Sequence, residues 1–173
     1  MSRQNRDRRH GATLLEFILV LPILLIAVLA IVEFGQLFAN LQQLELATRA
    51  GALESVETNL PPSGPIPPEV LEVITESLRA SKILGTSESI ENVGGVRIQH
   101  SYDNNPNSNP APPYTLTAGT PDTTVTITMA NEPYVHITVS LPTTRLAPNV
   151  LRQLGIDLQD RVSSQSKLLR HEF

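Results

Sequence analysis

The residues with the clearest chemical potential are a glycine and a glutamate at the start of a long apolar segment. Gly11 precedes Glu16 by five residues, and no other charge interrupts the segment from Ala12 to Val32. A carboxylate inside a membrane helix costs about 2.5–3.5 kcal/mol at the helix centre and less near an edge, so it needs compensation. Protonation, interfacial water or a positive charge could provide it. The simplest alternative is that Glu16 reaches the interface beside Arg8 and Arg9.

The other polar residues form no pattern typical of an enzyme or a metal site. Acid or amide side chains occupy every second position from Asp103 to Asn109, as at the start of a calcium-binding loop. However, Ser108 stands where such a loop needs glycine, and Tyr114 stands where it needs the bidentate glutamate. The four histidines lack metal-ligand spacing. His136 lies within an alternating segment and is expected to face solvent or a polar patch. We expect exposed helix positions for three further glutamates: Glu69, Glu72 and Glu76.

Composition narrows the function classes further. The chain of 173 residues has no cysteine, which excludes disulfides, cysteine zinc sites and thiol catalysis. Its net charge of −4 argues against nucleic-acid binding, because phosphate contacts need clustered Lys and Arg. We expect no cofactor, no metal, no small-molecule substrate and no enzymatic activity. An anchored enzyme is the weakest alternative, since no catalytic set is visible.

Residues 12–32 are predicted to cross a membrane. As a helix they span about 31 Å, close to the hydrocarbon thickness of a bilayer. The preceding residues 1–11 hold four arginines against Asp7, and a basic leader favours a cytoplasmic N-terminus with the rest of the chain on the far side. Pro22 predicts a local kink. A buried core helix and a cleaved signal peptide ending near Ala39 are the alternatives, and both fit these flanks less well.

The spacing of Gly11 and Glu16 resembles the processing site of type IV prepilins. The resemblance implies cleavage by a membrane aspartyl peptidase between Gly11 and Ala12, which makes Glu16 the fifth residue of the mature chain and is followed by Phe17. Cleavage would remove the basic leader and create an α-amino cation at Ala12. The Glu16 of a neighbouring subunit could then pair with this cation in a low-dielectric helix bundle and set the register of assembly.

A longer stretch resembles the TadE-like family, pilin-like (pseudopilin) components of bacterial tight-adherence, Flp-type pili. Glu16-Phe17-Ile18-Leu19-Val20-Leu21-Pro22, then Glu33-Phe34-Gly35 and Ala47-Thr48-Arg49-Ala50-Gly51-Ala52, correspond to its motifs, although Gln36 stands where the family often has Arg. The resemblance implies an inner-membrane subunit with a periplasmic or extracellular C-terminal domain. Its implied partners are a prepilin peptidase, other pilin-like subunits and the pilus assembly machinery. The alternative is an unprocessed, membrane-anchored envelope binding or accessory protein.

Residues 33–58 are predicted to continue the helix as an amphipathic stalk. Apolar residues recur at helical spacing, and their stripe could pack in a bundle, on the chain's own domain, or on both in succession. The proposed packing residues are Phe34, Leu37, Phe38, Leu41 and Leu44.

The remaining chain predicts an α+β domain over residues 69–173, after a Pro-rich linker at 59–68. A second helix should begin near Pro67-Pro68-Glu69 and run through Leu84 to Gly85. Alternating segments predict a small antiparallel sheet on the helices. The expected elements are strands at 96–102, 123–129 and 134–141, a short helix at 146–154, and a disordered-looking loop at 103–122. Residues 157–169 remain open between strand, which the family resemblance favours, and helix.

Overall fold

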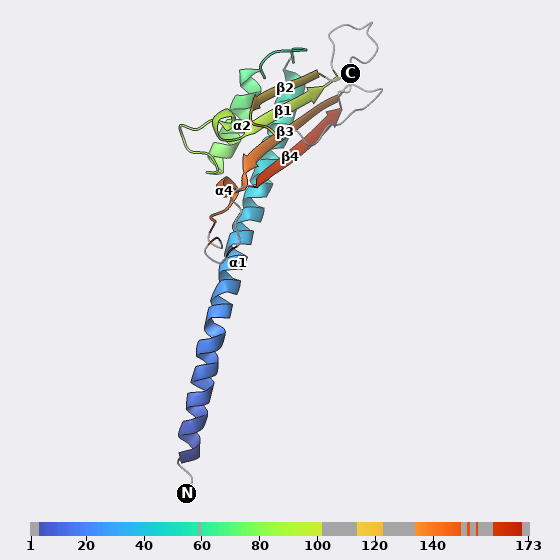
Figure 1. The fold of residues 1–173 in the computed structure, drawn as a ribbon. Helices are drawn as coiled ribbons and strands as arrows, with labels where there is room; N and C mark the ends of the chain where they lie inside the picture. Colours follow the sequence, from blue (N-terminus) through green and yellow to red (C-terminus); the bar gives the residue numbers. More distant parts are fainter. Residues whose placement is uncertain are drawn as a thin grey trace.

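A single helix of 54 residues dominates the molecule. The computed structural model describes the backbone of residues 4–58, 60–101, 114–122, 134–149, 152, 155 and 161–170, and the side chains of these residues except 4–13 and 170. Helix α1 runs from Gln4 to Glu57 without interruption and is about 81 Å long. Figure 1 shows its lower half standing free and its upper half behind a sheet. This confirms the predicted apolar helix with a long continuation.

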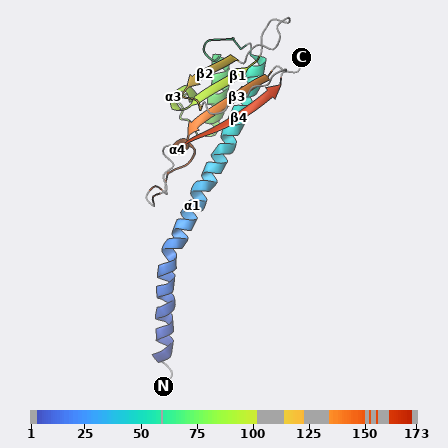
Figure 2. The same ribbon diagram turned by 45° about the vertical axis from the view of Figure 1, so that its right-hand side comes forward.

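Helix α1 stays continuous through Pro22. Figure 2 shows a gentle change of direction in the blue part of the helix, below the domain. Membrane helices tolerate an internal proline better than helices in water do, because neighbouring groups satisfy the freed carbonyl. The helix has no break at Pro22. The kink predicted there stays a prediction.

The domain combines a second helix and a small sheet on the upper half of α1. Helix α2 (Pro68–Ala80) packs against α1, and two single-turn helices, α3 (Ile90–Val93) and α4 (Thr143–Leu146), flank the sheet. The strands are β1 (Gly95–His100), β2 (Tyr114–Gly119), β3 (Tyr134–Pro142) and β4 (Val162–Arg170). Their order is β2-β1-β3-β4, and every neighbouring pair is antiparallel. The α+β prediction is therefore confirmed.

One face of the sheet forms the core with the two long helices. Val96 pairs with Val139 and Ile98 with Ile137 in the register of β1 and β3, so these apolar side chains share one face. They pack with Leu44 of α1 and with Val70, Ile74 and Leu78 of α2, all of them fully buried. The period of two in the strands and of three to four in the helices explains this division.

The opposite face of the sheet is polar and is crossed by the chain after β2. The backbone N–H of Asp122 donates to Ser140 Oγ at 2.9 Å, and Ser164 Oγ donates to Asp122 Oδ2 at 3.2 Å. These bonds tie the end of the β2 connection to β3 and β4. His136 and Thr138 lie on the same face and are buried.

Helix α2 ends four residues before the predicted position. The helix ends at Ala80, and Lys82 follows in the left-handed region with φ of 62°. The N–H of Lys82 donates to Arg79 O at 2.9 Å and the N–H of Ile83 donates to Leu78 O at 3.0 Å, the two bonds of a Schellman motif. The prediction of a helix through Leu84 was wrong because Ile83 and Leu84 leave the helix and enter the core.

Two further predictions need correction. The loop predicted at 103–122 contains β2, an edge strand whose Leu116 is buried opposite Ile98. The helix expected at 146–154 does not begin at Leu146, because α4 ends there and Ala147 is extended; residues 150, 151, 153 and 154 lie outside the described residues. Strand β4 settles residues 162–170 as strand. The predicted strand at 123–129 and the Asn-rich stretch 103–109 lie outside the described residues.

Candidate functional site: the free half of α1 and the surface above it

The apolar segment of α1 has no intramolecular partner in the part of the chain that the structure describes. Leu14 is 62% exposed, Phe17 64% and Ile31 72%, and none of the most apolar window of the helix is buried. By length and composition this helix can cross a membrane, and it is the only one among the described residues that can. A single N-terminal apolar helix of this kind fits a single-pass membrane anchor.

Glu16 lies on this exposed helix, one turn beyond Ala12. Gly11 and Ala12 lie within the helical backbone, because α1 already begins at Gln4. The boundary predicted between a leader and a membrane helix is therefore not a break in secondary structure. Glycine is the residue that leaves a helix at least cost, apart from proline, so the Gly11–Ala12 peptide is a favourable place for the helix to open.

The predicted stalk residues divide into two groups. Leu44 is fully buried in the domain core, and Leu37 and Leu41 pack against that core from below. Phe34 and Phe38 are 44% and 62% exposed. The leucines of the predicted stripe therefore pack on the chain's own domain, and the rings of Phe34 and Phe38 remain exposed.

One contact and one burial on α1 were not predicted from the sequence. Asn40 Nδ2 donates to the carbonyl of Leu146 at 2.6 Å and so fastens α4 to the helix. Glu33 is only 1% exposed, although its neighbours Val32 and Phe34 are open. A glutamate directly after an apolar segment would ordinarily be expected at an exposed interface, so its burial had no signal in the sequence.

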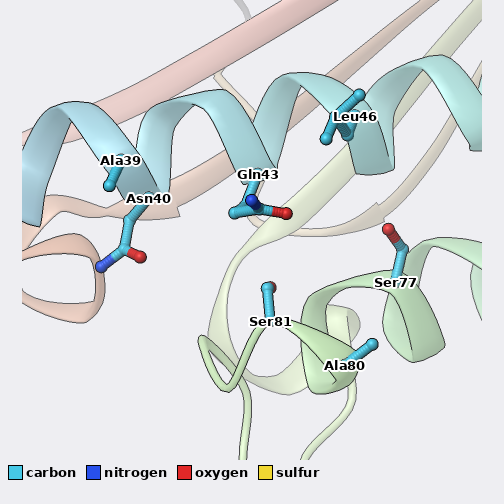
Figure 3. A pocket seen from close by; sticks show the side chains of 7 residues that line it. All are labelled: Ala39, Asn40, Gln43, Leu46, Ser77, Ala80 and Ser81. Carbon is cyan, nitrogen blue, oxygen red and sulfur yellow. The ribbon is translucent and has the colours of Figure 1, made fainter.

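A groove of about 490 Å³ lies between α1 and the carboxyl end of α2. Figure 3 shows Gln43 of α1 extending along the groove and the small side chains of Ser77, Ala80 and Ser81 forming the opposite wall. Ala39, Asn40 and Leu46 complete the lining. Neutral and mostly small side chains offer no acid, base or nucleophile arrangement here. The lining mixes polar side chains (Asn40, Gln43, Ser77 and Ser81) with apolar ones (Ala39, Leu46 and Ala80).

The glutamates of α2 behave as solvated helix residues. Glu69, Glu72 and Glu76 are exposed, and Glu76 pairs with Arg79 at 2.6 Å. Among the described residues no group of three or more His, Cys, Asp or Glu side chains could hold a metal ion.

Glu88 connects α2, α4 and the turn at Gly85 through its carboxylate and its backbone carbonyl. Glu88 Oε2 accepts the backbone N–H of Gly85 at 2.9 Å, and Arg145 of α4 donates to both carboxylate oxygens at 3.2 and 2.9 Å. Arg79 of α2 donates to the Glu88 carbonyl. The Gly85 bond is the largest cause that lowers the pKa of Glu88, followed by the bonds and charge of Arg145. This cluster positions α4, and its role is structural.

His136 is a buried base whose pKa is shifted. It lies on the polar face of β3, opposite Gln99 of β1, and is 1% exposed. Its Nε2 has no hydrogen-bond partner among the described residues. Burial lowers its pKa, and the charge of Arg97 lowers it further. Of the two settings expected for His136, solvent is excluded, because the side chain is buried on the polar face of the sheet.

The state of His136 predicts a loss of stability in mild acid. Because its pKa is lower in the fold than the ordinary 6.5, the unfolded chain binds the proton more readily. Stability is therefore present above about pH 6.5 and falls as the pH drops below it, by at most about 1.4 kcal/mol per pH unit. Thermal unfolding between about pH 7.5 and 5.5 should show this slope, and His136→Gln should remove it. An unchanged slope in His136→Gln would assign the dependence to other groups.

Comparison with known proteins finds a family match for one part of the chain. Residues 11–53 match the family model of TadE-like proteins. The match covers Gly11, Glu16, the apolar segment and the stalk up to Leu53, in agreement with the resemblance seen in the sequence. No curated protein and no solved structure matches the chain.

Proposed function

We propose that this chain, which carries the TadE-like segment at residues 11–53, is a minor pilin-like subunit of a Flp-type tight-adherence pilus. It would be anchored in the inner membrane by α1, with its N-terminus in the cytoplasm and its domain outside. The observation that carries the proposal is the free half of α1, an exposed apolar helix with one carboxylate near its start.

The arrangement supports a role in assembly. An exposed apolar helix about 30 Å long is stable only in lipid or against other helices. The packed domain above it is fastened to α1 through Asn40 and the shared core, so the domain and the stalk form one unit. Partners would be the prepilin peptidase, other pilin-like subunits and the assembly machinery. Pilus formation, and through it surface adhesion, would follow from helix–helix contacts.

Blocking the proposed cleavage tests this function. We expect Gly11→Val to retain residues 1–11 in the membrane-bound protein and to abolish surface pili. Valine places a branched side chain beside the Gly11–Ala12 bond and removes the positive-φ conformations that glycine permits, so the peptidase should no longer cut there. The retained basic leader keeps the N-terminus in the cytoplasm. Mass spectrometry of the membrane fraction and counting of pili measure the two effects.

Thr13→Val provides the matched control, because it introduces the same side chain two residues away. This variant should be processed and should support pili. If Gly11→Val yields the same mature mass as the unchanged chain, the processing claim fails. If it keeps the leader and still forms pili, the chain is an unprocessed anchored accessory protein.

A further inference from the structure

The lower end of the domain lies close to the level at which α1 enters the proposed membrane. Asn40 Nδ2 donates to the carbonyl of Leu146 at 2.6 Å, so α4 contacts α1 at residue 40. Figure 1 shows α4 at the end of the sheet nearest the free half of α1. Asn40 is eight residues beyond Val32, which places it about 12 Å above the apolar segment. The headgroup layer of a bilayer is about 5–7 Å thick, so α4 lies just outside it.

Two aromatic rings of α1 lie in the interval between the apolar segment and α4. Phe34 and Phe38 are both exposed. Phe38 is about 9 Å beyond Val32 along the helix, which is close to the outer limit of the headgroup layer. Aromatic and apolar side chains are favoured at the boundary between headgroups and acyl chains. The bilayer surface is therefore expected just below Asn40.

Lys82 lies at the same level on the α2 side. It directly follows Ser81, which lines the groove together with Asn40 of α1 (Figure 3). The left-handed backbone of Lys82 ends α2 at this point, and the side chain is exposed. Helix α2 thus runs toward the membrane and ends with a cation at its lower end.

Two further cations lie at this level on the α4 side. Arg145 belongs to α4 itself, and its side chain is 42% exposed. The carbonyl of Arg161 accepts hydrogen bonds from the backbone N–H and from Oγ1 of Thr143, both at 2.9 Å. Arg161 therefore lies beside the first residue of α4, and its side chain is exposed.

The acid next to these cations is already bonded. The Glu88 carboxylate accepts hydrogen bonds from Arg145 and from the N–H of Gly85. Neither Lys82 nor Arg161 takes part in an ion pair among the described residues. These two cations can therefore bind an anionic partner without breaking a contact of the fold.

Other glutamates of the two long helices are buried or lie farther from the bilayer. Glu33, below Asn40 on α1, is only 1% exposed. Glu45 is exposed but lies about 8 Å above Asn40. Glu57 and Glu69 are exposed at the far end of the domain, where α1 ends and α2 begins. The end of the domain that faces the bilayer is thus the end with the available cations.

We infer that the lower end of the domain is a lipid-contact surface, on which Lys82 and Arg161 bind the headgroups of anionic phospholipids. Charges act over about 8 Å at physiological ionic strength, and long basic side chains extend toward the headgroups, so both cations are within range. This contact depends on the proposed membrane anchoring of α1 and adds a second attachment to the bilayer. It restricts the tilt of the domain on its single helix.

Quenching of a fluorescent label by headgroup-attached nitroxide tests the contact. The full chain has no cysteine, so Thr144→Cys on α4 carries one label at the lower end and Glu69→Cys carries one at the far end; both positions are exposed. In vesicles that contain phosphatidylglycerol, the label at 144 should be quenched more than in pure phosphatidylcholine, and 0.5 M salt should remove the difference. The label at 69 should show no difference.

Removal of the two cations makes the test specific. In the Thr144→Cys background, Lys82→Gln combined with Arg161→Gln should lose the response to phosphatidylglycerol. Arg145 is left in place, because it holds Glu88. Arg49→Glu is the matched control: it changes the net charge by the same two units, lies about 14 Å above Asn40, and should keep the response.

The outcomes separate this contact from the proposed function. Equal quenching at position 144 in the two kinds of vesicle overturns the lipid contact, and so does a response that survives loss of both cations. In either case a chain that floats with the vesicles retains its anchor, and the proposed function stands. A chain that floats with neither kind of vesicle lacks the membrane anchor, which overturns both.

Discussion

Replacement of Glu16 by alanine is expected to abolish pilus assembly while leaving membrane insertion intact. Glu16 is the one charge of the apolar segment, and α1 holds it exposed, one turn beyond Ala12. Removal of one partner from a buried ion pair costs about 3–5 kcal/mol, which corresponds to a loss of more than about a hundredfold in association. Insertion should be unchanged or improved, because the substitution removes a charge from the lipid phase.

Leu15→Ala is the control for this experiment. Leu15 neighbours Glu16 and is 68% exposed, so its truncation removes apolar surface without touching the charge. Pili should still form in that variant. Counting surface pili and fractionating membranes separates assembly from insertion. Normal pili with Glu16→Ala would end the register role of the glutamate and favour the reading in which Glu16 only reaches the membrane interface.

Replacement of Gly51 by valine is expected to destabilise the domain strongly. A Cβ at this position would lie 2.5 Å from Cγ1 of Ile74 and 3.3 Å from Cδ1 of Ile137. Both isoleucines are fully buried, so neither can move aside without disturbing the core. Overpacking of this kind costs about 1–3 kcal/mol for small additions, and valine adds two further methyl groups. Gly51→Ala should show a smaller loss, partly offset by about 1 kcal/mol of better helix propensity.

Gly35 supplies the opposite case in the same helix. A Cβ there meets nothing within 4 Å, so Gly35→Ala should keep or raise stability through helix propensity alone. Unfolding of the full-length chain in detergent micelles by urea or heat measures all three variants. Equal stability of Gly51→Val and the unchanged chain would contradict the close approach of α1, α2 and the sheet at Gly51.

Features encoded over short distances were predictable from the sequence. The apolar segment and the stalk form one helix because every position from Leu14 to Val32 except Glu16 suits a helix in lipid, and the proline is tolerated there. The strands around Ile98 and Ile137 follow from alternation of apolar and polar residues. The placement of His136 on the face opposite the core follows from the same alternation, but its burial does not.

Features that depend on tertiary contact were not predictable. Helix α2 ends at Ala80 because the chain turns there and packs Ile83 and Leu84 into the core. This packing depends on the rest of the fold and cannot be read from the residue types of α2. Strand β2 was missed because Tyr114–Gly119 contains Thr, Ala and Gly next to a Pro-rich stretch, and pairing with β1 decides its conformation. The need for glycine at position 51 comes from the close approach of Ile74, which the sequence does not show.

The candidate site shows the same division. Glu16 and Gly11 could be singled out by spacing alone, since a lone carboxylate in an apolar run is conspicuous. The division of the stalk into buried Leu44 and exposed Phe38 depends on where the domain packs.

The intact mass of the protein purified from its native membrane tests the central claim most directly. The account predicts a mass that begins at Ala12, because a pilin-type subunit loses its basic leader before assembly. A mass that retains Met1 to Gly11 would contradict processing and leave a permanently anchored accessory protein. A soluble species that begins near Asn40 would contradict the membrane anchor itself.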